Sequence, residues 1–220
     1  MTLQDFHIGF DIELDKTLDF EYAYIQPEQK DYWLNKAQDR IVKYKVFGNN
    51  PTRTSFEETQ KRIDDLRTIV KDSSPIVPTS SGNISYITLP DDYKFLVRHR
   101  ALINTKTVTG VQVSHDSIGV FLEDPFWEPI AEEPLYYFLG NTIVYETKGN
   151  FNITSTVLTY IKKYAKIQYG SQYTSPTTDI NTELPEEVHQ EILDLAISMV
   201  LENIESQRYQ TNLNELNKSE

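Results

Sequence analysis

The sequence predicts an α+β fold: a helical bundle, made of a helical hairpin plus a C-terminal helix, with a β-rich antiparallel insertion. Two observations predict it. Apolar residues recur at spacings of three and four in residues 27–74 and again in 183–208, which is the helical period. Between them, in residues 84–170, apolar and polar residues alternate as they do in strands. The helical core is therefore expected to come from both sides of the insertion.

Two helices are expected before the insertion. The first begins near Pro27, because proline costs little at the opening position of a helix. The second opens with Ser55 and Glu58 at the spacing of a capping box, in which each side chain bonds the other residue's backbone N–H. It is expected to end before Asp72. A short connection between the two helices favours a helical hairpin.

A third helix is expected from Pro185 to about Arg208. Apolar residues cover most of its circumference, which predicts burial on more than one side. Residues 1–26 mix acidic and apolar side chains without a clean period and are expected to form an extended N-terminal arm. Residues 209–220 are polar and are expected to form a C-terminal tail.

The insertion is expected to hold short strands and one short helix between a Pro/Ser/Gly linker (75–83) and a polar linker (170–182). Its clearest signal is a hairpin whose two-residue turn begins with glycine, Gly140-Asn141. The expected strands are Ser85–Leu89, Tyr93–Val97, Val108–Val113, Leu135–Leu139, Thr142–Tyr145, Phe151–Ile153 and Thr156–Lys162, and the expected short helix is His115–Glu123.

The composition excludes several classes of protein. The chain has 220 residues, no cysteine and a formal charge of −12, so disulfides, thiol catalysis and cysteine-based metal sites are excluded. The acidity lies at the two ends: residues 1–26 hold six acids and one lysine, and residues 179–220 hold ten acids and two basic residues. Such a surface argues against wrapping nucleic acid, which needs many cations, but it suits a path along which DNA must not stick.

No catalytic, cofactor or metal site is expected. None of the four histidines has another histidine four residues away, and no glycine-rich phosphate-binding motif occurs. His115 and Asp116 are adjacent, and we interpret them as the surface start of a helix rather than as part of a metal site. The pairs of acids fall at turns and helix starts, so we expect no enzyme. No export leader or membrane span is expected either.

Two features have two interpretations each. Several aromatic residues fall outside periodic elements, where they either form a protein interface or pack onto their own core. They are Phe126, Trp127, Tyr169, Tyr173 and Tyr209. Lys162 and Lys163 end a strand, and we interpret them as protection of an edge strand, with contact to a nucleic-acid backbone as the alternative.

Five segments of the chain have a recognisable pattern: Phe6–Asp15, Asp31–Gln38, Gln60–Arg67, Leu89–Tyr93 and Leu184–Tyr209. With these segments the chain resembles the head–tail connector proteins of tailed bacteriophages. The resemblance is closest to the ring structural proteins of crAss-like phages, which are similar to the tail tubular protein A type of adaptor.

This resemblance implies a virion structural protein of the neck or tail, assembled in the cytoplasm of the bacterial host. It implies an oligomeric, dodecameric ring that joins the portal to the tail and lets double-stranded DNA pass without sequence preference. The implied partners are further copies of the chain, the portal protein and adjacent tail or neck ring proteins, with no membrane and no cofactor. Two alternatives stay open: a tail-associated glycan-cleaving enzyme and a host-encoded soluble interaction domain.

The suspected interface residues are apolar or aromatic residues of the two ends and of the third helix. Those of the ends are expected to lack enough apolar surface of their own to become ordered alone, and those of the helix lie on its second apolar face. The set is Phe6, Ile8, Phe10, Ile197, Leu201, Tyr209 and Leu213.

Overall fold

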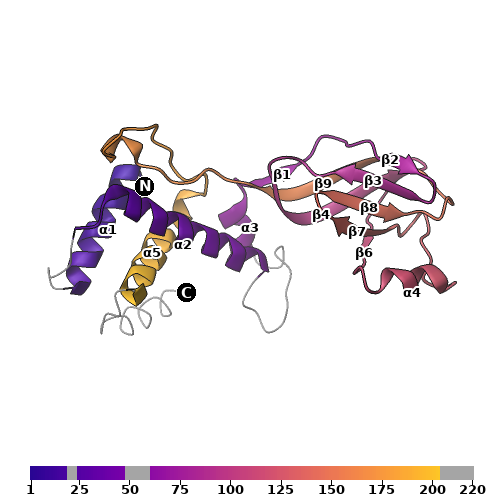
Figure 1. Cartoon of the computed structure of the whole chain (residues 1–220), viewed down its shortest axis with the longest axis horizontal. Helices are drawn as coiled ribbons and strands as arrows, with labels where there is room; N and C mark the ends of the chain where they lie inside the picture. Colours follow the sequence, from indigo (N-terminus) through magenta and orange to yellow (C-terminus); the bar gives the residue numbers. More distant parts are fainter. Residues whose placement is uncertain (19–23, 48–59, 204–220) are drawn as a thin grey trace. The chain divides into compact units, whose positions relative to one another are not determined.

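The computed structural model describes residues 1–18, 24–47 and 60–203 (Figure 1). The chain divides into two compact units: a helical unit of residues 1–69 and 164–220, and a β unit of residues 70–163. The described helices of the helical unit are α1 (Leu3–Leu18), α2 (Pro27–Phe47), α3 (Gln60–Leu66) and α5 (His189–Asn203), with the 3-10 turns η2 (Gly170–Gln172) and η3 (Glu186–Val188).

Helix α1 occupies most of the segment that was expected to be an extended arm, so that expectation was wrong for its local structure. Thr2 and Asp5 form a capping box. The Thr2 backbone N–H donates to Asp5 Oδ2 over 2.8 Å, and the Asp5 backbone N–H donates to Thr2 Oγ1 over 3.2 Å. Every fourth side chain along the inner face is fully buried: Phe6, Phe10 and Leu14.

Helix α5 packs against both α1 and α2, and it is buried on most of its circumference, as its two apolar faces predict. Gly9 permits the close approach of α1, because a Cβ at that position would lie 2.8 Å from Leu193 Cδ2. The helix begins at His189, a few residues after the predicted start at Pro185. Its predicted end near Arg208 lies outside the described residues.

The second helix of the expected hairpin is present in part. Its capping box, Ser55 and Glu58, lies outside the described residues. Helix α3 ends at Leu66, and Val70, which was expected on the helix, begins strand β1 instead. The change occurs because Val70–Asp72 pairs with the strand that ends the β unit.

The β unit contains two sheets. One has the strand order β1-β9-β4-β5 and the other β2-β3-β8-β7-β6. All neighbours are antiparallel except β6 and β7, which are parallel. The elements are β1 (Val70–Asp72), β2 (Thr79–Ser81), β3 (Ile84–Thr88), β4 (Tyr93–Ile103), β5 (Lys106–Val108), β6 (Val111–Gln112), α4 (Ile118–Glu123), β7 (Leu135–Leu139), β8 (Thr142–Glu146) and β9 (Ile153–Lys162).

The predicted hairpin is confirmed as β7 and β8, with Leu139 opposite Thr142. Gly140 has φ +58°, a conformation that a glycine adopts without steric cost. The edge-strand interpretation of Lys162 and Lys163 was wrong, because β9 is an inner strand with β1 on one side and β4 on the other. Lys163 Nζ donates to the Asp91 carbonyl oxygen over 2.9 Å.

The predicted fold class, a helical bundle with a β-rich antiparallel insertion, was wrong. The described residues form a mixed α/β protein that is mostly β-rich, with two sheets. The error has a physical origin. Strands β4 and β9 are eleven and ten residues long, so they build a sheet with its own core rather than a small appendage to the helices. The parallel pairing of β6 and β7 also departs from a purely antiparallel insertion.

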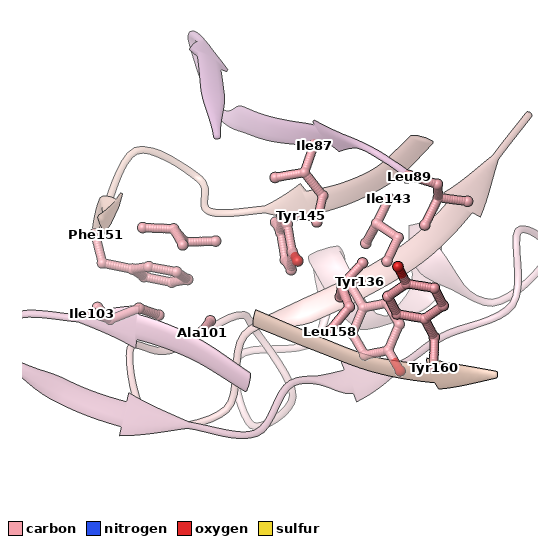
Figure 2. Packing of buried hydrophobic residues seen from close by; sticks show 11 residues of the cluster. Ile87, Leu89, Ala101, Ile103, Tyr136, Ile143, Tyr145, Phe151, Leu158 and Tyr160 are labelled. Carbon is pink, nitrogen blue, oxygen red and sulfur yellow. The ribbon is translucent and has the colours of Figure 1, made fainter. Parts of the chain in front are cut away.

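The core of the β unit lies where apolar side chains of the two sheets meet (Figure 2). One sheet contributes Ala101, Leu158 and Tyr160, and the other contributes Tyr136 and Tyr145. Alternate residues of each strand point inward, which is the arrangement of two packed sheets. Aromatic rings therefore supply a large part of the buried area.

A buried histidine is built into this core. His99 is 2% exposed, and its Nδ1 accepts the Gly110 backbone N–H over 3.1 Å. The neutral ring therefore carries its proton on Nε2, which lies 2.8 Å from the Tyr145 hydroxyl oxygen. Burial lowers the pKa of His99 from 6.5 to about 4. Protonation would place a second N–H against the Gly110 N–H, so the folded state disfavours the charged ring.

This arrangement predicts that the β unit loses stability in mild acid. Because the pKa of His99 is lower in the folded state, its contribution is complete above pH 6.5 and is lost as the pH falls towards 4. We expect a loss of about 2 kcal/mol between pH 7 and pH 5. Urea unfolding of the full chain, with hydrogen exchange of β4 and β8 peptides as the readout, measures it. The H99Q variant, which cannot titrate, should show a smaller loss; an equal loss would contradict the assignment.

Candidate functional site

A row of polar side chains on α2 binds the segment through which the chain returns from the β unit. Asn35 bonds both backbone groups of Ile167. Its Nδ2 donates to the Ile167 carbonyl oxygen over 2.7 Å, and its Oδ1 accepts the Ile167 N–H over 2.8 Å. Gln38 Nε2 donates to the Ala165 carbonyl oxygen over 3.2 Å. The side-chain amides thus act as a substitute for a neighbouring strand.

Asp31, one turn before Asn35 on α2, is the centre of a buried cluster. Its Oδ1 lies 2.8 Å from His7 Nε2 of α1, and its Oδ2 accepts the Tyr169 backbone N–H over 2.7 Å. The Tyr173 hydroxyl also donates to Oδ2, and burial together with this carboxylate raises the pKa of Tyr173. One carboxylate therefore joins α1, α2 and the returning segment.

A second ionic cluster joins the other helices. Lys45 of α2 lies 2.6 Å from both Asp65 Oδ2 of α3 and Glu191 Oε2 of α5. Lys45 and Asp65 are each 7% exposed. Burial lowers the pKa of Lys45, but the two carboxylates outweigh it and the pKa is raised. The charge is compensated on two sides, as a buried ammonium requires.

His115 and His189 each donate a hydrogen bond to a backbone carbonyl oxygen. His115 Nε2 donates to the Phe138 carbonyl oxygen over 2.6 Å, which holds the ring against strand β7. His189 Nε2 donates to the Leu184 carbonyl oxygen over 3.0 Å. Within the residues that the structure describes, no group of three or more His, Cys, Asp or Glu side chains is placed to hold a metal ion. Over the same residues, no helix is long and apolar enough to cross a bilayer.

The suspected interface residues are not brought together on one surface. Phe6, Phe10 and Leu201 are fully buried inside the helical unit, and Ile197 is 2% exposed. Ile8, on the opposite face of α1, is 48% exposed. Tyr209 and Leu213 lie outside the described residues. Among the described members, exposed apolar area for a partner is therefore present at Ile8.

The aromatic residues outside periodic elements divide into two groups. Tyr169 packs edge-on against His7 with ring centroids 4.8 Å apart, and Tyr173 bonds Asp31, so both belong to the helical core. Phe126 and Trp127, which follow α4, are 93% and 62% exposed. These two side chains form an apolar surface of the β unit that its own core does not cover. Tyr209 lies outside the described residues.

The outer face of α2 was missed by the sequence analysis. Five residues spaced by three and four, an aromatic residue at each end and three cations between, form one stripe that we call the basic stripe: Trp33, Lys36, Arg40, Lys43 and Phe47. The three cations are exposed, and Lys36 Nζ lies 4.7 Å from the Trp33 ring centroid. The middle of the stripe lines an open groove of about 710 Å³. The groove lies between α2 and the end of α5, where Met199 also lines it.

The outer face of α1 has the opposite character. Four residues spaced by three and four form a stripe with an acid at each end and an apolar pair between, which we call the acidic stripe: Asp5, Ile8, Ile12 and Asp15. Ile8 and Ile12 are 48% and 57% exposed. The heptad-like spacing of both stripes is visible in the sequence, but the sequence predicts an arm rather than a helix for α1, and the apolar periodicity of α2 indicates only its buried face.

A comparison with protein families gives a match over nearly the whole chain. The family model described as phage tail ring protein 3/4 matches residues 1–214 of the chain. No curated protein matches the chain.

The contacts of Asn35 predict its role in closing the helical unit. The N35A substitution should lower the free energy of unfolding by about 1–3 kcal/mol, because it leaves the backbone N–H and carbonyl of buried Ile167 without their partner. The N35D variant keeps the acceptor for the N–H but sets a carboxylate against the carbonyl oxygen, so it should not restore stability. Urea unfolding of the full chain measures both; wild-type stability of N35A would contradict the assigned role.

Proposed function

The chain belongs to the phage tail ring protein 3/4 family, and from this premise we propose that twelve copies form a ring that joins the portal to the tail and lets the genome pass. Membership makes the chain a structural ring protein of the phage tail, as its resemblance to the ring proteins of crAss-like phages implied. We propose four further properties: the copy number, contact with the portal, passage of DNA and assembly in the host cytoplasm.

The observation that carries the proposal is the presence of two unlike exposed faces on one helical unit. A ring of identical subunits is built by a heterologous contact, in which each copy offers one surface to the copy before it and a different surface to the copy after it. The basic stripe of α2 and the acidic stripe of α1 are two such surfaces.

Contact with other proteins of the tail has separate support in the β unit. Phe126 and Trp127 expose large apolar rings, and such side chains are enriched where proteins bind one another. We propose that this surface meets the portal or an adjacent ring. A structural role without catalysis agrees with the polar clusters, since Asp31, His7 and Lys45 are each engaged in joining helices.

Passage of DNA is supported by charge. A formal charge of −12 on each copy would give a twelve-membered ring a strongly negative field, which repels phosphates and lets the duplex slide without being held. The surface that faces the channel is expected to be among the acidic ones.

The experiment is to measure the mass of the purified full chain by mass photometry and to image it by negative-stain electron microscopy, alone and with the portal protein. We expect a closed ring with a central opening, and a larger complex when portal is added. A chain that stays monomeric at every concentration, both alone and with portal, would contradict the proposal.

We further propose that Tyr209 and Leu213 contact a neighbouring subunit or the portal. Deletion of residues 207–220 should then leave the melting temperature of the chain unchanged and weaken association with the ring or portal. The melting temperature is measured by circular dichroism and association by mass photometry. A lower melting temperature would assign these residues to the core, and unchanged association would show that they have no part in assembly.

A further inference from the structure

We propose that the acidic stripe of α1 in one copy docks on the basic stripe of α2, along the groove between α2 and α5, in the next copy. The inference rests on the proposed ring, and it names the contact that closes it. Both surfaces belong to the helical unit, so the β unit is left to carry other contacts.

The charge of the basic stripe is opposite to that of most of the chain. The chain has 33 acidic and 21 basic residues, yet the exposed face of α2 presents Lys36, Arg40 and Lys43 in a row. Among the described residues, none of these three cations forms an ion pair with an acid of its own chain. The groove also holds two acids, and one of them, Asp39, accepts a hydrogen bond from the Tyr164 hydroxyl. A row of cations on so acidic a protein is suited to an acidic partner surface.

The long cationic side chains of the basic stripe can reach the acids of the acidic stripe when the two helices lie side by side. The acidic stripe has apolar residues inside and acids at its ends, and the basic stripe has cations inside and aromatic rings at its ends. At 1.5 Å per residue, Asp5 and Asp15 lie about 15 Å apart, and Lys36 and Lys43 about 10 Å apart. The lysine stems are long enough to span the difference, and their methylene groups can cover Ile8 and Ile12.

Both stripes repeat at three and four residues. This spacing keeps the residues of each stripe on one face of its helix, so each face can lie along a neighbouring helix. The second copy is therefore a better occupant than a nucleic acid, which would leave Ile8 and Ile12 exposed.

Crosslinking tests the contact directly, because the chain has no cysteine of its own. The double variant I12C/K43C, treated with a flexible bismaleimide, should give a ladder of dimer, trimer and larger species on a denaturing gel. Each single variant carries one thiol per copy and should stop at dimer. Absence of the ladder, while the ring itself persists, would overturn the contact.

Charge reversal gives a second test with a matched control. The R40E substitution should raise the concentration at half-assembly by about tenfold, since like charges would then face one another. Adding D15K should restore part of the loss. K106E makes the same change of charge at an exposed residue of the β unit and should leave assembly unchanged. Normal assembly of R40E would contradict the proposal, as would equal weakening by K106E.

Different results would contradict the proposed ring and the proposed contact between α1 and α2. A wild-type chain without any ring would remove both the proposed function and this contact. A normal wild-type ring that survives R40E and gives no ladder would remove the contact alone. An intramolecular crosslink between K43C and Y209C, with no ladder from I12C/K43C, would assign the groove to the chain's own C-terminal segment and overturn the proposal.

Discussion

The polar row on α2 is the constraint on which the helical unit depends. The chain leaves this unit at Ile69 and re-enters it at Tyr164, so the unit can close only if the returning segment is held in place. Asp31 and Asn35 do this by taking up backbone groups that have no strand beside them. Because an unpaired buried amide is costly, this bonding fixes the path of the segment.

The strand pattern of the β unit was largely predictable, and the fold class was not. The hairpin of β7 and β8 follows from local chemistry, since Gly140 allows the tight turn and alternation fixes the register. The parallel pair of β6 and β7 joins segments that are separated by α4, and no local pattern specifies such a contact. The size of the β core depends on how two sheets pack, which single strands do not reveal.

In the helical unit, the composition of residues 1–26 led to a wrong prediction. Acidic residues between Phe6, Phe10 and Leu14 obscure the apolar period of a helix, although its capping box, Thr2 and Asp5, is present in the sequence. Ile197 and Leu201 were correctly placed on a second apolar face of the third helix, but that face is covered by the same chain. Periodicity finds apolar faces; it does not say whether the covering helix belongs to the same copy or to another one. Ile8 and Ile12 of α1 are 48% and 57% exposed, so the described residues of the same chain leave much of both side chains uncovered.

The pairing of β1 with β9 has a consequence for how such proteins diversify. Val70 lies opposite Ile161, so the chain enters and leaves the β unit on adjacent antiparallel strands, about 5 Å apart. Two close crossing points make the β unit exchangeable, because a different module with neighbouring ends can be accommodated without moving α2 or α5. Evolution can thus vary the β unit while it keeps the helices unchanged, and a protein engineer can use the same connection to display a foreign domain.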